Sequence, residues 1–192
     1  MDDETFWDAI EGCRRVTRDP DERLEWLRGR LAGRPETEIL RFQASLDRVV
    51  APTLTWDLWG AADRIMGWCS DDSFFYFRLW LVGLGRDGFD RVTRDPDSLA
   101  DVPGVRRLVG RSSQVWDDEE WLEWEELDYV AVRAYEHVTG RTADDFYAAV
   151  ESLGDDPEPM DPAGERWDAR DDEESHRRLP RLSALFPLSP AS

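Results

Sequence analysis

Hydrophobic residues in the first part of this chain recur at three- and four-residue intervals, which is the spacing of one face of an α-helix. The pattern predicts three helices before Pro52, over about 3–18, 20–32 and 35–51. Proline or glycine separates each helix from the next, and these residues commonly mark helix starts and ends. The N-terminal part is therefore expected to be helical throughout.

The stretch from Leu54 to Gly85 predicts two further helices joined by a short turn. Their expected ranges are about 53–66 and 71–84. Gly67 is expected to close the first of them in a left-handed conformation, and the Ser70 side chain to accept a free N–H at the start of the second. The pair predicts an αα-hairpin.

From Phe74 to Leu84, the second helix of this hairpin is apolar on every face except at Arg78 and Gly83. A helix of this kind is normally enclosed by other helices, so we expect it to be the buried centre of the fold. It is too short to cross a bilayer. If Arg78 is enclosed with its neighbours, a carboxylate or carbonyl oxygens from another segment must receive its guanidinium. A structural role for Arg78 is the favoured interpretation, and contact with an anion is the alternative.

The heptapeptide RVTRDPD occurs twice, at 15–21 and 91–97. The sequences that follow the two copies differ, which indicates a reused joint between helices instead of a duplicated domain. In the second copy, Asp95 is expected to cap a short helical turn. Residues 105–113 are weakly patterned and are expected to form a mobile connection.

Asp117 predicts the start of a long helix that ends at Gly140, with Glu120 in position to complete a capping box. A last core helix is expected from Thr142 to about residue 153. Since all predicted elements are helices, the fold class is all-α. We expect a single-domain helical bundle around the helix at 71–84, with an extended acidic C-terminal tail.

The composition changes after Gly154 to a proline-rich and strongly charged segment with few aliphatic residues, and such a segment cannot pack as a core. The predicted organisation is a helical domain over 1–154 and an acidic tail over 155–192. Within the tail, residues 181–188 regain apolar side chains. We expect this stretch to dock on the helical body, together with Trp167.

Charge narrows the classes of partner. The 192 residues include 43 Asp and Glu against 24 Lys and Arg, which gives a formal net charge of −19. This charge repels nucleic-acid phosphates, so we expect no direct nucleic-acid binding and a protein partner with a basic surface. The acidic N-terminus lacks the basic and apolar regions of a secretory signal. A cytoplasmic protein without membrane association is expected.

Residues for common enzyme chemistries are scattered. His137 and His176 lie in different regions, and no Cys or His spacing matches a zinc site. Ser70 and Ser73 have no histidine nearby in the sequence. The GLGRDG motif follows a predicted helix and not a strand, so it is not expected to bind phosphate. We therefore predict neither a metal site nor a cofactor, and the sequence leans against an enzyme.

The segment WDDEEWLEWEELD contains eight carboxylates and no basic residue. The plainest interpretation is a solvated acidic face. A protein-docking face is the second interpretation, because tryptophan is enriched in binding hot spots, and a catalytic or divalent-cation site is the third. The residues of the candidate docking face are Trp116, Trp121, Trp124, Glu123, Glu125 and Glu126.

The residues LWGAADRIMGWCSDDSFFYFRLWLVGLGRDGFDRVTRDPDSLAD resemble a bacterial family known as domain of unknown function 4240. Its members share a similar Cys-Ser-Asp-Asp-x-Phe and Phe-Arg-x-Trp-Leu signature followed by Pro-Asp-x-Leu. The Phe6-Trp7 start, the AYEHVTG segment and the PRLSALF end also fit. The resemblance implies a small, mainly cytosolic and mostly helical protein, and it supplies no catalytic residues.

The function that we predict is a non-enzymatic protein-interaction or regulatory module that presents its acidic, tryptophan-bearing face to a basic partner. Two alternatives remain open at this point. One is a carboxylate-based hydrolase or a divalent-cation-binding protein. The other is a nucleic-acid-mimicking inhibitor, in which surface carboxylates imitate a phosphate track.

Overall fold

The computed structural model describes residues 3–154 and 161–188, and it confirms the all-α fold class. Within these ranges the chain forms α-helices and short 3₁₀-helices and no β-strand. The start of the predicted tail, at residues 155–160, lies outside the described residues. The division of the chain at residue 154 therefore stays a prediction.

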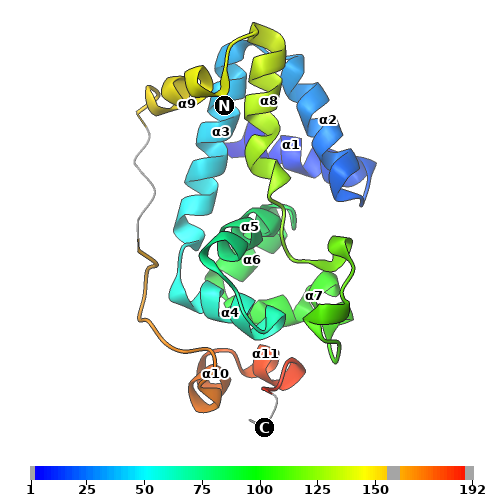
Figure 1. The fold of residues 1–192 in the computed structure, drawn as a ribbon, viewed down its shortest axis with the longest axis vertical. Coiled ribbons are helices and arrows are strands. Elements are labelled where there is room, and N and C mark those ends of the chain that lie inside the picture. The colour runs from blue at the N-terminus through cyan, green and yellow to red at the C-terminus, as the bar shows by residue number, and fades with distance from the viewer. Residues whose placement is uncertain (1–2, 155–160, 189–192) are drawn as a thin grey trace.

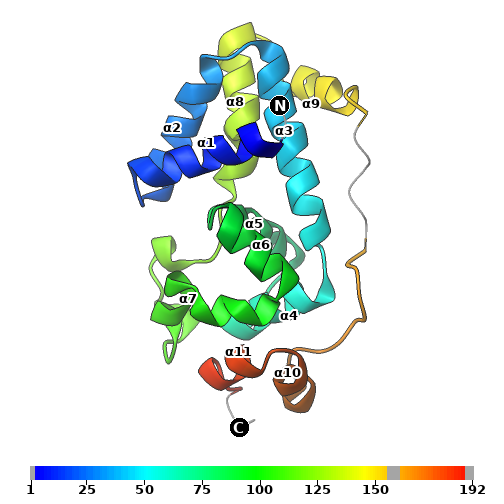
Figure 2. The ribbon, with the colours of Figure 1, turned by 180° about the vertical axis from the view of Figure 1, so that it is seen from behind.

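One group of helices forms the upper part of the molecule in Figures 1 and 2. Helix α8 packs against both α2 and α3, α1 crosses in front of them in the view of Figure 2, and α9 lies beside α3. The members of this group are α1 (Asp3–Val16), α2 (Pro20–Ala32), α3 (Glu36–Val50), α8 (Glu126–Thr139) and α9 (Ala143–Glu151).

A second group lies below the first, and the C-terminal helices cover its far side (Figure 1). The group consists of α4 (Trp56–Met66), α5 (Asp71–Val82), α6 (Arg86–Arg94), η2 (Pro96–Asp101) and α7 (Pro103–Leu108). The covering helices are α10 (Asp172–Arg178) and α11 (Pro180–Leu185), and the remaining short elements are η1 (Ala51–Thr53), η3 (Ser113–Val115) and η4 (Asp118–Glu120). A continuous hydrophobic core runs through both groups, and the Trp7 and Phe89 rings, 5.3 Å apart, connect α1 to α6.

Helix α5 lies where the two groups meet (Figures 1 and 2). Phe77 and Leu81 are fully buried. Phe75, Tyr76 and Trp80 are only partly buried, so one side of α5 is not enclosed as the sequence led us to expect. The apolar residues on this side of the helix line the edge of the core.

The turn between α4 and α5 is fixed by its own backbone and side chains. Gly67 ends α4 with a φ of 82°, which a residue with a side chain rarely adopts. The Ser70 hydroxyl oxygen accepts the N–H of Ser73 at 3.1 Å. The Asp63 carboxylate accepts the N–H of Cys69 at 2.7 Å, so the turn is tied back onto α4.

The second RVTRDPD copy joins α6 to η2. Asp95 precedes η2, but its side chain makes no capping hydrogen bond, so the predicted cap is wrong. The expectation of a mobile connection at 105–113 is also wrong over its first part, because this part belongs to α7. Val105 and Leu108 lie one helical turn apart, and both are buried against the core.

The long helix predicted from Asp117 is wrong in its first third, because α8 begins at Glu126. A helix through this segment would stack carboxylates on successive turns, which is unfavourable. The chain instead turns at η4, and the N–H of Trp124 donates to the carbonyl oxygen of Tyr76 at 3.1 Å. This bond anchors the segment to α5.

The C-terminal residues return to the body at α4. The N–H of Ala163 donates to the carbonyl oxygen of Leu54 at 2.8 Å, and the N–H of Trp56 donates to the carbonyl oxygen of Ala163 at 3.0 Å. Leu182 is fully buried, and Trp167 packs against the core. Among the described helices, none combines the length and the apolar character that crossing a bilayer requires.

Replacement of Phe77 by alanine tests the importance of α5. We expect Phe77→Ala to lower the free energy of unfolding by about 3–5 kcal/mol, because a fully buried phenyl ring is lost and a cavity remains. Val16→Ala, at a residue that is 61 % exposed, should change it by no more than about 0.5 kcal/mol. Denaturant unfolding followed by circular dichroism measures both, and equal effects of the two substitutions would contradict this view of α5.

Candidate functional site

The three tryptophans of the predicted docking face are not exposed together. Trp116 and Trp124 are buried, at 8 % and 7 % exposure, and Trp121 is half-buried. The Trp121 ring packs edge-on against Trp116, with 5.2 Å between ring centroids. The prediction of an exposed aromatic face at these residues is therefore wrong. Burial of the two large indoles in the core is more favourable in free energy than their exposure to water.

The carboxylates of the same segment have different environments. Glu125 is exposed and accepts the Tyr76 hydroxyl at 3.0 Å, a hydrogen bond that raises the pKa of Tyr76 to about 12. Glu126 forms an ion pair with Arg133. Glu123 is half-buried and accepts a hydrogen bond from the Ser73 side chain. The segment therefore contributes single carboxylates to different neighbours and does not form one continuous acidic face.

Asp117 and Glu120 form the predicted capping box, but it opens the short 3₁₀-helix η4 and not a long helix. The N–H of Asp117 donates to a Glu120 carboxylate oxygen at 3.0 Å, and Arg111 forms an ion pair with the same carboxylate. These contacts, the arginine first, lower the pKa of Glu120 to about 2. The capping residues thus stabilise η4 and leave the start of α8 to Glu126.

The turn at residues 67–70 lies among carboxylates from separate parts of the chain, because Asp63, Glu123 and Asp71 all act on the charge of the Cys69 thiol and Glu125 acts on Glu123. We call these four carboxylates, with Trp68 of the turn, the acidic corner. Trp68 is 64 % exposed, in a turn between two capped helices. The position of an aromatic residue between Gly67 and Ser70 was the available sequence signal, because a residue in such a turn belongs to neither helix face.

Burial controls the protonation of the acidic corner. Burial raises the pKa of Asp63, although the hydrogen bond from Cys69 opposes the rise. Burial also raises the pKa of Glu123, against the hydrogen bond from Ser73 and with the help of nearby Glu125. A positive charge placed beside either carboxyl group would lower its pKa, because a cation stabilises the ionised form.

The two cysteines are poor nucleophiles. Burial, followed by the negative charges of Asp63 and Glu123, raises the pKa of the Cys69 thiol. Burial also raises the pKa of Cys13 to about 11. Since the thiolate is the reactive form, both side chains are structural.

The serine and histidine side chains that were considered as catalytic groups do not come together. The hydroxyl oxygen of Ser70 is engaged as a helix cap, and His137 and His176 lie exposed on α8 and α10. In the part of the chain that the structure describes, no group of three or more His, Cys, Asp or Glu is placed to hold a metal ion. The arrangement is suited to binding, with carboxylates and an exposed indole as its functional groups.

Arg78 lies inside the fold at 3 % exposure. Its Nε–H donates to the Thr53 hydroxyl oxygen at 3.0 Å, and its Nη2 donates to the Val50 carbonyl oxygen at 3.1 Å. The guanidinium also lies 5.9 Å from the ring centroids of Phe74 and Phe75. These contacts hold the end of α3 and η1 against α5, which favours the structural role.

Comparisons with known proteins give one finding. Residues 1–137 match the family model described as "Protein of unknown function (DUF4240)", which covers the acidic corner and Arg78 and ends within α8. Neither a curated protein nor a solved structure matches the chain.

The Arg78 contacts predict a stability effect. Arg78→Met removes the charged donor from the Thr53 hydroxyl and the Val50 carbonyl, which keep only the hydrogen bond that the hydroxyl donates to the carbonyl. We expect a loss of about 1–3 kcal/mol in the free energy of unfolding, because hydrogen bonds from a charged group are lost. Arg86→Met, at an exposed arginine of α6, is the matched control and should have little effect. Chemical denaturation measures both variants, and unchanged stability of Arg78→Met would argue against the clamp.

The raised pKa of Glu123 predicts a pH-dependent effect. Because the folded-state pKa lies above the unfolded one, this group contributes stability at low pH that is lost as the pH rises through the folded pKa. Glu123→Gln removes this loss, so its stability relative to the parent should increase from about pH 4 to about pH 7. Denaturation series at several pH values, with Glu119→Gln at an exposed neighbour as the control, measure the trend. A trend of the opposite sign would exclude burial as the cause.

Proposed function

Because the chain belongs to the DUF4240 family of proteins of unknown function, we propose its function from its own geometry. The protein is an interaction or regulatory module of the bacterial cytoplasm, and its acidic corner docks a protein with a basic surface. The observation that carries this proposal is the 64 % exposure of Trp68, the neighbour of Cys69, on whose thiol the charges of Asp63, Glu123 and Asp71 act. The docking face is thus moved from the tryptophans at 116, 121 and 124 to the turn between α4 and α5.

The shape of the turn supports docking at Trp68. Gly67 and Ser70 fix the two ends of the turn, and the Asp63–Cys69 hydrogen bond ties it to α4. An aromatic residue on a rigid turn loses little conformational freedom when a partner covers it. Exposed tryptophans in such positions commonly supply much of the binding energy in a protein interface.

The charge of the corner supports a basic partner. Asp71 and Glu125 are exposed, and Asp63 and Glu123 are partly buried carboxyls whose ionised form a cation would stabilise. A lysine or arginine that approaches the corner offsets the free-energy cost of keeping these partly buried carboxylates ionised. The net charge of −19 also speeds the encounter with a positively charged protein.

A carboxylate-based enzyme is the second candidate, and one observation favours it. Asp63 and Glu123 are carboxyls with a raised pKa, which is the property of a general acid. An acid of this kind acts with a base or a nucleophile in reach of the substrate, and the nearby Cys69 thiol is buried with a raised pKa. Docking is therefore the better supported function.

Substitution at the corner tests the docking proposal. The parent protein, immobilised at physiological salt, captures proteins from a bacterial lysate, and each captured protein is then purified and its affinity measured. We expect Trp68→Ala to weaken binding of a basic partner by about 2 kcal/mol, roughly 30-fold, because it removes the anchor. The fold should be unaffected, since Trp68 is exposed.

A matched pair of charge reversals separates specific from general attraction. Glu123→Arg with Glu125→Arg changes the corner, and Asp87→Arg with Asp90→Arg makes the same change in net charge at exposed residues of α6. The corner variant should lose the partner and the α6 variant should retain it. Equal losses with both pairs, or unchanged affinity of Trp68→Ala, would sink the proposal.

A further inference from the structure

We propose that α4 and η2 form a second docking surface, which receives a helical partner segment that carries tryptophan, arginine and leucine. Residues 161–188, which we call the clasp, occupy this surface as an intramolecular competitor. The surface consists of Asp57, Gly60 and Arg64 on α4 and Asp97 and Asp101 on η2. The inference concerns a different surface from the acidic corner and does not rest on the function proposed above.

Trp167 is the first anchor of the clasp. Its ring lies directly on Gly60, where an added Cβ would be 2.2 Å from Cζ2 of the indole. A side chain at residue 60 would therefore displace the ring. The Trp167 indole N–H donates to the Asp57 carboxylate at 2.9 Å. The surface thus offers both a flat contact for an indole and an acceptor for its polar edge.

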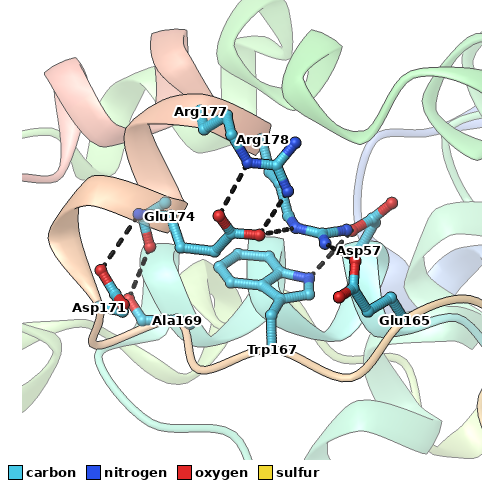
Figure 3. Close-up of polar contacts among 9 residues, drawn as sticks. Asp57, Glu165, Trp167, Ala169, Asp171, Glu174, Arg177 and Arg178 are labelled. Atoms are coloured by element: carbon cyan, nitrogen blue, oxygen red, sulfur yellow. Dashed lines mark hydrogen bonds and ion pairs between the residues drawn. The ribbon is translucent and has the colours of Figure 1, made fainter.

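Arg178 is the second anchor, and it lies over the Trp167 ring at 5.5 Å from the ring centroid (Figure 3). Its Nη1 contacts the Asp57 carboxylate at 3.0 Å and its Nη2 contacts Glu165 at 2.6 Å. Glu174 receives its Nε–H (Figure 3). Glu165 and Glu174 belong to the clasp, so the clasp itself orients the Arg178 guanidinium. Asp57 is the residue of the docking surface that binds it.

The η2 element receives the start of α11. Asp97 is buried at 6 % exposure, and its carboxylate accepts the backbone N–H of Arg181 at 3.0 Å and of Leu182 at 2.9 Å. Arg181 also forms an ion pair with Asp101. Leu182 is fully buried beside them. A helix with a leucine in its first turn is therefore the shape that this part of the surface accepts.

The contact between the clasp and the body combines the buried Leu179 and Leu182 with several buried polar groups. The Arg64 side chain is fully buried, and its Nη2 contacts Asp172 of the clasp at 2.9 Å. Three buried polar atoms at or beside the contact have no hydrogen-bond partner, namely Arg64 Nε, Ser98 Oγ and Ser183 Oγ. Such atoms weaken an interface, and polar interfaces within one chain resemble those of transient complexes. The clasp is therefore suited to exchange.

The family match covers the surface, whereas the PRLSALF stretch of the clasp resembles the family outside the matched residues. Residues 1–137 include all of α4 and η2, and the match ends before the clasp begins. The three carboxylates of the surface, on Asp57, Asp97 and Asp101, complement a segment with arginines and free helix N–H groups. A partner segment with this chemistry competes with a tethered clasp, whose effective concentration is on the order of millimolar. Loosening the clasp should therefore increase the affinity for the partner.

The test uses a fluorescent peptide with the sequence of residues 161–188 as the probe, added to full-length protein. The double variant Trp167→Ala with Arg178→Ala loosens the clasp, and we expect it to bind the probe at least about tenfold more tightly than the parent. Arg177→Ala is the matched control, because Arg177 contacts Glu174 of the clasp and should leave probe binding at the parental level. Fluorescence anisotropy measures the affinities.

A blocking substitution on α4 tests the surface itself. Gly60→Leu, added to the loosened variant, should abolish probe binding, because the leucine fills the place of the indole. Asp57→Ala, also added to the loosened variant, provides a second test at a half-exposed side chain and should weaken binding at least about tenfold, since it removes the acceptor of both anchors. Equal binding to the parent and the loosened variant, or binding that survives both α4 substitutions, would overturn the proposal. A concentration-dependent dimer that excludes the probe would assign the surface to a second copy of the chain and would also overturn it.

Discussion

The structure depends on the burial of aromatic rings along α5. The rings of Trp59, Phe74, Phe77 and Trp80 form a stacked series that runs from α4 along the length of α5, with neighbouring centroids 4.6 to 6.3 Å apart. This series holds the α4–α5 turn in place, and the Arg78 guanidinium adds the end of α3 to it. The positions of both proposed docking surfaces follow, because the acidic corner lies at one end of α4 and the clasp covers another side of the same helix.

Many of the carboxylates form ion pairs with arginines that are close in the sequence. Examples are Glu120, Glu126 and Glu174, whose pairs lie within a turn or along a helix. Such exposed pairs contribute little to stability. The carboxylates of the two proposed docking surfaces differ from these exposed pairs. Those of the acidic corner accompany Trp68, and those of the second docking surface bind the clasp with Trp167. The two proposals above assign the charge in these two places to recognition.

The two surfaces adjoin each other on α4. Two residues of the clasp act on the pKa of Asp63 with opposite signs, since Arg170 lowers it and Asp168 raises it. Displacement of the clasp, as proposed above, would uncover Asp57 and Gly60.

The sequence by itself determined the features that depend on neighbouring residues. Apolar spacing defined the all-α fold class, and Gly67 and Ser70 marked the turn because their effects act within one helical turn. The tertiary structure decided the features that depend on distant residues: the Tyr76–Trp124 hydrogen bond that ends the helical pattern before Glu126, the burial of Trp116, and the capture of the clasp by Asp97. Local spacing cannot reveal these contacts, because the free energy of burying an indole or pairing a carboxylate depends on which surface the folded chain places opposite it.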